Sequence, residues 1–380
     1  MKRYFIVHEY FGIRVYDSVN KKEYFYDHEN AKRIKNMLDG EYNEINQVKE
    51  GNFSAPLKIS MNLTKRCNLR CKQCFSDSGE IRAPELTTEE MYKLFDDMAK
   101  NGTFYICLGG GEPLTRPDLM DILEYGKQKQ LAISIVSNGL LLTKELIEQL
   151  NTKDLDYFWV SFEGLKENHE NLRGVGTFER TLNALKLLQD NYKGRTALRM
   201  SLNKFNLGEV KDLIKIAEDY DIDLIRFTPI LSFGRAKNED LCITQDQYIE
   251  FLKEVKTYTS KVKIVYPNMP NEDKIWIGTN GFGCHCGKEA IWVDEVGTVN
   301  PCIFWGDDYN IGNVRTDDYM EMWDRSLSIS NFTGRFSQIF NALKNTIRHS
   351  KCLLSKLHKC TFHKTTWLLY TSFAHFASTF

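Results

Sequence analysis

The sequence lacks an excess of charge of either sign. Its 50 Lys and Arg residues are balanced by 51 Asp and Glu residues, and the formal net charge is −1. A protein that binds the phosphates of a nucleic acid needs a clustered basic excess. We therefore expect no nucleic acid among the partners of this protein.

Long apolar runs are also absent. The N-terminal segment, residues 1–17, interrupts its apolar residues with charged and polar ones, so it has no continuous apolar stretch of the kind found in signal peptides. No run reaches the roughly 18 apolar residues that a membrane span requires, and residues 365–380 also fall short. The sequence predicts a soluble, cytoplasmic protein without a membrane partner.

The end of the chain lacks acidic residues. Residues 325–380 contain no Asp or Glu, although 51 acidic residues precede them, and they hold half of the eight histidines. Such an abrupt change of composition is not typical of a single domain. We interpret residues 325–380 as an atypical basic tail.

The first 55 residues predict a small strand-rich cap. Apolar and polar residues alternate with period two in 4–9, 12–17 and 22–27, and a short helical pattern follows in 29–38. Such a cap could pair a substrate segment on an exposed strand edge, or it could simply cover the bottom of the next domain. Both interpretations remain open at this point.

Residues 56–260 predict an α/β domain, a partial (β/α)6 barrel of the TIM type. Short apolar runs rich in β-branched and aromatic residues alternate there with amphipathic helices, which is typical of parallel βα units. In such a barrel the sites lie on the loops that follow the strand C-termini. The predicted strands are 57–63, 103–110, 131–139, 156–164, 196–203 and 223–230, and the predicted helices are 87–102, 116–130, 143–150, 176–192 and 207–220.

Three of the ten cysteines are crowded into eight residues. Cys67, Cys71 and Cys74 follow the first predicted barrel strand with C-x3-C-x2-C spacing. Three thiolates on one loop would leave one iron of a [4Fe-4S] cube without a protein ligand, and that iron could chelate a small molecule. A zinc site is the alternative, but zinc normally takes four protein ligands or paired C-x2-C knuckles.

Together with the three cysteines, residues on the loops after the next three predicted strands carry a family resemblance. Residues 57 to about 235 resemble the radical S-adenosylmethionine (SAM) superfamily. The resemblance implies a [4Fe-4S] cluster on the three cysteines and SAM beside it. Glu112 in Gly-Gly-Glu-Pro would accept from the SAM ammonium, and the fork of Arg173 would bind its carboxylate. The SAM-binding residues that it implies are Gly110, Gly111, Glu112, Ser137, Asn138, Ser161, Glu163 and Arg173.

Singly, these residues have simpler interpretations. The glycine-rich and Ser-Asn-Gly segments could be ordinary turns, and Arg173 could be a surface residue. The chain also departs from the family where many relatives carry an aromatic residue before the third cysteine, because Gln73 stands there and Phe75 comes just after. We interpret Cys107 and Cys242 as buried core residues.

A second group of cysteines lies in residues 261–324, which resemble the start of the SPASM extension of radical SAM enzymes. The resemblance implies an auxiliary [4Fe-4S] cluster on Cys284 and Cys302, with Cys286 or Cys352 as further ligands. A zinc hairpin that uses His285 is the alternative. Because the dense final cysteines of a full extension are missing, either the extension is reduced or residues 325–380 are an altered sequence.

The resemblance implies the reaction and the partners. A radical SAM enzyme cleaves SAM reductively to a 5′-deoxyadenosyl radical, and SPASM relatives use it to modify ribosomal peptides or proteins by hydrogen abstraction. The partners would be a peptide or protein substrate and a low-potential electron donor such as flavodoxin or ferredoxin. Two alternatives remain, a radical SAM enzyme that acts on a small metabolite and a non-catalytic iron-sulfur or zinc scaffold.

Overall fold

The computed structural model describes residues 2–266, 287–304 and 309–331. Its first element is a small sheet with strand order β3-β2-β1-β4. The strands β1 (Tyr4–Glu9), β2 (Gly12–Asp17) and β3 (Lys22–Asp27) are antiparallel, and β4 (Tyr42–Ile45) runs parallel to β1. Helix α1 (His28–Met37) is capped by Asp27, whose side chain accepts from the backbone N–H of Asn30.

The small sheet packs between α1 and the main domain. Ile6, Ile13 and Val15 form a core with α1 on one face, and on the other face Tyr16 stacks on Phe104 with ring centroids 4.4 Å apart. The Tyr16 hydroxyl also donates to the carbonyl of Gln130 at 3.0 Å. These partners lie just before β6 (Tyr105–Gly110) and β7 (Ala132–Ser137) of the main sheet, so the small sheet contacts the end of the barrel at which the strands begin.

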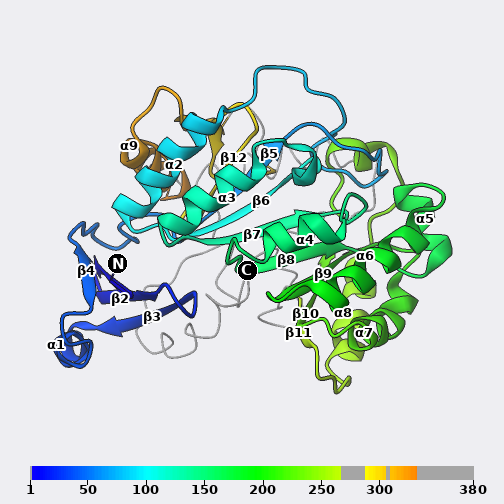
Figure 1. Ribbon diagram of the computed structural model, residues 1–380, viewed down its shortest axis with the longest axis horizontal. Helices are drawn as coiled ribbons and strands as arrows, with labels where there is room; N and C mark the ends of the chain where they lie inside the picture. Colours follow the sequence, from blue (N-terminus) through cyan, green and yellow to red (C-terminus); the bar gives the residue numbers. More distant parts are fainter. Residues whose placement is uncertain (1, 267–286, 305–308, 332–380) are drawn as a thin grey trace.

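The main sheet has strand order β11-β10-β9-β8-β7-β6-β5-β12-β13-β14 in the described residues. It is parallel from β11 to β12, and only the last two pairings are antiparallel. Figure 1 shows its helices along the outer face. The strands are β5 (Lys58–Thr64), β6 (Tyr105–Gly110), β7 (Ala132–Ser137), β8 (Tyr157–Ser161), β9 (Thr196–Leu202), β10 (Leu224–Pro229), β11 (Lys263–Val265), β12 (Ala290–Val293), β13 (Thr298–Asn300) and β14 (Gly312–Asn313).

The helices bury an apolar stripe against alternate strand residues, such as Ile106, Leu108 and Phe158. Local sequence fixes several of their ends. Thr87 and Glu90 form a capping box at α2, and Thr244 and Gln247 form another at α8. The helices are α2 (Thr88–Asn101), α3 (Leu119–Gln128), α4 (Lys144–Leu150), α5 (Lys166–Arg173), α6 (Thr177–Asn191), α7 (Val210–Asp219), α8 (Gln245–Val255) and α9 (Tyr319–Asn331), with short 3-10 turns η1 (Pro113–Thr115), η2 (Leu207–Glu209) and η3 (Gly234–Asn238).

The predicted α/β barrel is confirmed. Strands β12 and β13 pair with each other, with Gly297 in the turn between them. The structure adds elements that the sequence patterns did not predict, among them β4, α5, α8, β11, β14 and α9. It also joins β12 to β5 in parallel, so the segment after residue 261 extends the barrel sheet. Helix α9 continues across the composition change at Asp324, with Trp323 and Leu327 buried.

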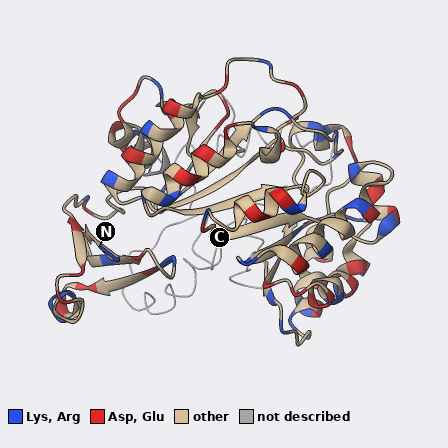
Figure 2. Cartoon of the chain, viewed as in Figure 1, with Lys and Arg blue, Asp and Glu red and all other residues tan. Residues whose placement is uncertain are grey.

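Lys, Arg, Asp and Glu are interspersed over the outer helices (Figure 2). No helix in the described part of the chain is both long enough and apolar enough to cross a membrane.

Candidate active site

The three predicted cluster cysteines lie on one loop between β5 and α2. The loop is closed by backbone hydrogen bonds, since Cys67 donates to Gly79 at 2.9 Å and Gly79 donates to Lys65 at 2.8 Å. Helix α5 holds it from a second side, where the backbone N–H of Lys72 donates to the carbonyl of Leu172 at 2.9 Å. The loop is therefore positioned by elements that are far from it in the sequence.

Arg235, which the sequence analysis missed, clamps this loop from the segment after β10. Its guanidinium donates to the carbonyls of Cys71 (2.8 Å) and Ser78 (2.9 Å) and forms an ion pair with Asp77 at 2.9 Å. The preceding Gly234 has φ +55°, and a Cβ there would lie 2.2 Å from the carbonyl oxygen of Phe75. Only glycine fits so close to the loop.

The three thiols suit an iron-sulfur cluster. Each is half-buried. Burial raises the pKa of Cys67 to about 11, with smaller contributions from Glu112 and from the charges of Cys71 and Cys74, so the three groups are electrostatic neighbours. The Cys67 sulfur accepts from the backbone N–H of Leu69 at 3.4 Å. Such N–H···S contacts tune clusters.

No group of three or more His, Cys, Asp or Glu side chains in the described residues is arranged to hold a single metal ion. A cube does not need such convergence, because its three cysteines ligate three different irons. The donor set of the loop therefore fits a [4Fe-4S] cluster.

Glu112 joins the loops after β6 and β7. Its carboxylate is fully buried and accepts from the Ser137 hydroxyl at 2.8 Å, the Asn138 backbone at 2.7 Å and the Leu114 backbone at 3.1 Å. Burial raises its pKa. The Asn138 amide in turn donates to Asn68 on the cysteine loop at 2.7 Å. The structure thus brings Glu112, Ser137 and Asn138 together beside the cysteines.

The glycines before Glu112 allow the same close approach. A Cβ on Gly111 would lie 2.1 Å from the carbonyl oxygen of Arg66. The backbone N–H of Glu112 donates to that carbonyl at 2.8 Å. Gly111 therefore lets the backbone after β6 lie directly against the cysteine loop, and Gly110 allows a similar approach to the end of β5, where a Cβ would lie 2.8 Å from the carbonyl oxygen of Thr64.

Glu163 and Arg173 form a buried ion pair beyond β8. Their closest distance is 2.8 Å, and the side chains are 1% and 10% exposed, respectively. Glu163 also accepts from the Ser201 backbone at 2.7 Å and from the Gln73 amide at 3.1 Å. Cys71 is an electrostatic neighbour of Arg173. Ser161 is buried at the end of β8 on the same side of the site.

Gln73 stands where the sequence analysis noted a departure from the family. Its Oε1 atom is buried and has no hydrogen-bond partner among the described residues. This acceptor lies between two cluster cysteines in the sequence and next to Glu163 in space. It is available to a donor of a bound ligand, so the residues present also fit SAM.

Part of the predicted auxiliary site can be placed. Cys302 is buried, and its sulfur accepts from the backbone N–H of Phe304 at 3.5 Å. Cys284, Cys286 and Cys352 lie outside the described residues. Cys107 and Cys242, which we interpreted as buried core residues, are both half-buried. Cys242 packs against the apolar core, and Cys107 lies at a strand position that faces the inside of the barrel.

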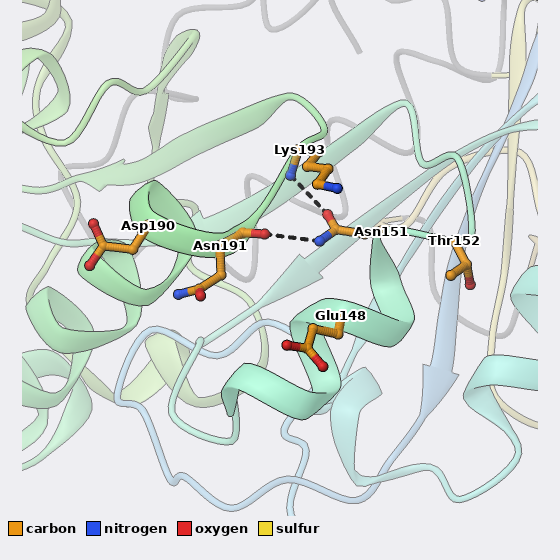
Figure 3. Close-up of a pocket in the computed structure, with 6 residues that line it drawn as sticks. All are labelled: Glu148, Asn151, Thr152, Asp190, Asn191 and Lys193. Atoms are coloured by element: carbon orange, nitrogen blue, oxygen red, sulfur yellow. Dashed lines mark hydrogen bonds between the residues drawn. The ribbon is translucent and has the colours of Figure 1, made fainter.

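A hollow lined by polar residues lies at the opposite end of the barrel, between the ends of α4 and α6 (Figure 3). Asn151 bridges it by donating to the carbonyl of Asn191 at 2.9 Å and accepting from the backbone of Lys193 at 2.8 Å. Both contacts link helix ends to each other. The hollow is a structural junction at the end where the strands begin, away from the cysteine loop.

The barrel and the cysteine loop define a radical SAM enzyme. The chain belongs to the radical SAM superfamily, whose family model matches residues 61–217, and a model described as an iron-sulfur cluster-binding domain, SPASM, matches residues 284–360. Membership implies a [4Fe-4S] cluster and SAM as cofactors, and the SPASM domain binds auxiliary iron-sulfur clusters. The second match includes part of the acid-free tail.

Individual relatives cover most of the chain. An AdoMet-dependent heme synthase of Methanosarcina barkeri is 30% identical over 72% of this chain and 83% of that protein. The subtilosin biosynthesis protein AlbA of Bacillus subtilis is 26% identical over 82% and 71%. Among solved structures, Streptococcus suis SuiB bound to its precursor peptide SuiA superposes with a TM-score of 0.69 at 16% identity, over 85% of this chain and 87% of that one.

Proposed function

We propose that this radical SAM enzyme modifies a ribosomal peptide or protein by hydrogen abstraction. The observation that carries the proposal is the extent of the similarity to SuiB, a protein solved with its precursor peptide. That similarity covers 85% of the chain and so reaches well beyond the barrel segment at 61–217. The Bacillus relative, a bacteriocin biosynthesis protein, adds support from sequence.

In this proposal Cys67, Cys71 and Cys74 ligate three irons, and the residues beside them bind SAM. When bound, the cluster supplies the electron that cleaves SAM to the radical that attacks the substrate. Glu112 accepts a hydrogen bond from the SAM ammonium. The N–H groups of Arg173 that do not donate to Glu163 bind the SAM carboxylate. The buried Oε1 of Gln73 accepts from a donor of the bound ligand. The surrounding loops exclude water. The remaining SAM contacts that we propose are Gly110, Gly111, Ser137, Asn138, Ser161 and Glu163.

In this proposal the first 55 residues are a cap domain. The small sheet rests on the end of the barrel where the strands begin, through Tyr16 and Phe104. Its strand β3 pairs on one side only, with β2, in the described residues. A substrate segment could add to that edge as a further strand. We propose that residues 1–55 bind the substrate peptide there.

We further propose one auxiliary [4Fe-4S] cluster, on Cys284 and Cys302 of residues 261–324 with Cys286 or Cys352 as a further ligand. The match of the iron-sulfur domain model from residue 284 supports this placement. Residues 56–260 are then the catalytic barrel and 325–380 the atypical tail. A low-potential donor such as flavodoxin or ferredoxin reduces the catalytic cluster.

A second function has specific support, because the Methanosarcina relative is a heme synthase. A radical SAM enzyme for a small metabolite would use the same cluster loop. The two functions are separated by incubating the reconstituted enzyme anaerobically with reductant, SAM and either a peptide encoded beside its gene or a porphyrin. We expect a SAM-dependent change of peptide mass that the Cys71→Ala variant does not produce. An unchanged peptide together with a modified porphyrin would contradict the proposal.

A further inference from the structure

His169 is a buried histidine beside the candidate active site that has no role in the reaction described so far. It lies on α5 and is fully buried. Its ring packs against those of Phe162 and Phe178, with centroids 4.9 and 5.9 Å away. Burial, and then the charge of Arg173, lower the pKa of His169 to about 3. The ring is therefore neutral at neutral pH.

The two ring nitrogens of His169 have different partners. The backbone N–H of Glu163 donates to Nδ1 at 3.2 Å. Because a backbone N–H can only donate, Nδ1 carries no proton, and the proton of the neutral ring is on Nε2. Nε2 lies 3.5 Å from the hydroxyl oxygen of Thr181 on α6, and that hydroxyl donates its own proton to the carbonyl of Thr177 at 2.9 Å. Helix α6 thus favours the tautomer that accepts from Glu163.

The backbone of Glu163 is held on both sides of its side chain. His169 accepts from its N–H, and the Asn206 amide donates to its carbonyl at 2.8 Å. Glu163 and His169 are both buried, so water does not replace a lost partner. A buried N–H group without an acceptor is strongly unfavourable. Removing the Nδ1 acceptor should therefore shift Glu163.

A shift of Glu163 would move Arg173. One Glu163 carboxylate oxygen accepts from the Arg173 guanidinium at 2.8 Å, and the other accepts from the Ser201 backbone at 2.7 Å. His169 and Arg173 are four residues apart on α5, and so lie on the same side of the helix. A chain of contacts therefore leads from the histidine through the carboxylate to the guanidinium.

We propose that His169 is a positioning residue for SAM binding. By accepting from the backbone of Glu163, it sets the place of the Glu163–Arg173 pair, and with it the guanidinium that binds the SAM carboxylate. This inference rests on the proposed contact of Arg173 with SAM. The site then needs a neutral acceptor at the place of Nδ1 rather than a histidine as such.

The test measures the affinity of the reconstituted enzyme for SAM by anaerobic equilibrium titration of His169 variants. Phe supplies a ring without an acceptor, whereas Asn keeps an oxygen near the place of Nδ1. We expect His169→Phe to weaken SAM binding by about tenfold, and His169→Asn to bind within about threefold of the wild type. His169→Gln, whose amide reaches the place of Nε2 instead, should behave like His169→Phe, and it carries the test if the Phe variant does not fold.

A double-mutant cycle separates positioning from a general loss of stability. In the Arg173→Gln background, His169→Phe or His169→Gln should weaken SAM binding little further, because the histidine acts through the guanidinium. Leu188→Ala is the matched control, since Leu188 is buried on α6 two turns beyond Thr181. It should lower the temperature of unfolding and leave the SAM affinity unchanged. Cluster absorbance checks that each variant holds its iron.

Three results would overturn the positioning role and leave the proposed SAM contacts standing. They are wild-type affinity in the Phe and Gln variants, a loss in His169→Asn as large as that in His169→Gln, and an equal loss with and without Arg173. Wild-type affinity of Arg173→Gln alone would instead reject the contact of Arg173 with SAM, and the positioning role with it.

Discussion

Replacing Arg235 with Gln should make the catalytic cluster labile without unfolding the barrel. Arg235 donates to the carbonyls of Cys71 and Ser78 at 2.8 and 2.9 Å, with a side chain that is 23% exposed. Hydrogen bonds from a charged donor contribute about 1.5–3 kcal/mol each, and the partial exposure favours the lower end of this range. The two bonds together therefore stabilise the closed loop by about 3 kcal/mol.

If a chelator removes iron from the opened loop, 3 kcal/mol corresponds to about 100-fold faster iron loss. The assay follows the visible absorbance of the reconstituted cluster after a chelator is added under anaerobic conditions. Arg82→Gln is the matched control, because Arg82 pairs with the same Asp77 at 3.0 Å but is 65% exposed. An exposed pair contributes at most about 1 kcal/mol. Equal rates of iron loss for Arg235→Gln and Arg82→Gln would refute the reasoning.

Three further predictions address the rest of the site. Glu112→Gln should weaken SAM binding in equilibrium titrations and leave the cluster absorbance intact, because it removes a charged acceptor and no iron ligand; unchanged binding would reject the role of Glu112. Gly111→Ala should prevent assembly of the cluster loop, since its Cβ would lie 2.1 Å from a backbone carbonyl oxygen, whereas Gly208→Ala, with nothing within 4 Å, should assemble normally. Iron analysis should give about eight irons per chain with one auxiliary cluster, and about four in the Cys284→Ala/Cys302→Ala double variant; about twelve in the wild type, or four in both proteins, would contradict the single auxiliary cluster.

The sequence predicted the parts of this protein that short patterns encode. The period of the apolar residues located the six barrel strands, and the spacing of Cys67, Cys71 and Cys74 indicated the cluster. The loops with Glu112 and Ser137 were placed correctly because each follows directly after a strand of a parallel sheet, where such loops gather at one end.

Features that depend on distant contacts were missed. Arg235 is more than 150 residues from the loop that it clamps, and no local pattern marks it. The pairing of β12 with β5 is equally non-local. Helix α5 has few apolar residues, so it lacks a clear helical stripe, and β4 is only four residues long. Helix α8 was also missed but does not depend on distant contacts. It could have been predicted from the sequence, because Thr244 and Gln247 have the spacing of a capping box.

The most direct test of the account is the formation of 5′-deoxyadenosine by the reconstituted enzyme under anaerobic conditions with a strong reductant. Chromatography should detect 5′-deoxyadenosine with the wild type and none with Cys67→Ala, Cys71→Ala or Cys74→Ala, because each cysteine supplies a thiolate to the cluster that cleaves SAM. Retained 5′-deoxyadenosine formation in any of these single variants, or none with the wild type carrying its full iron content, would contradict the account.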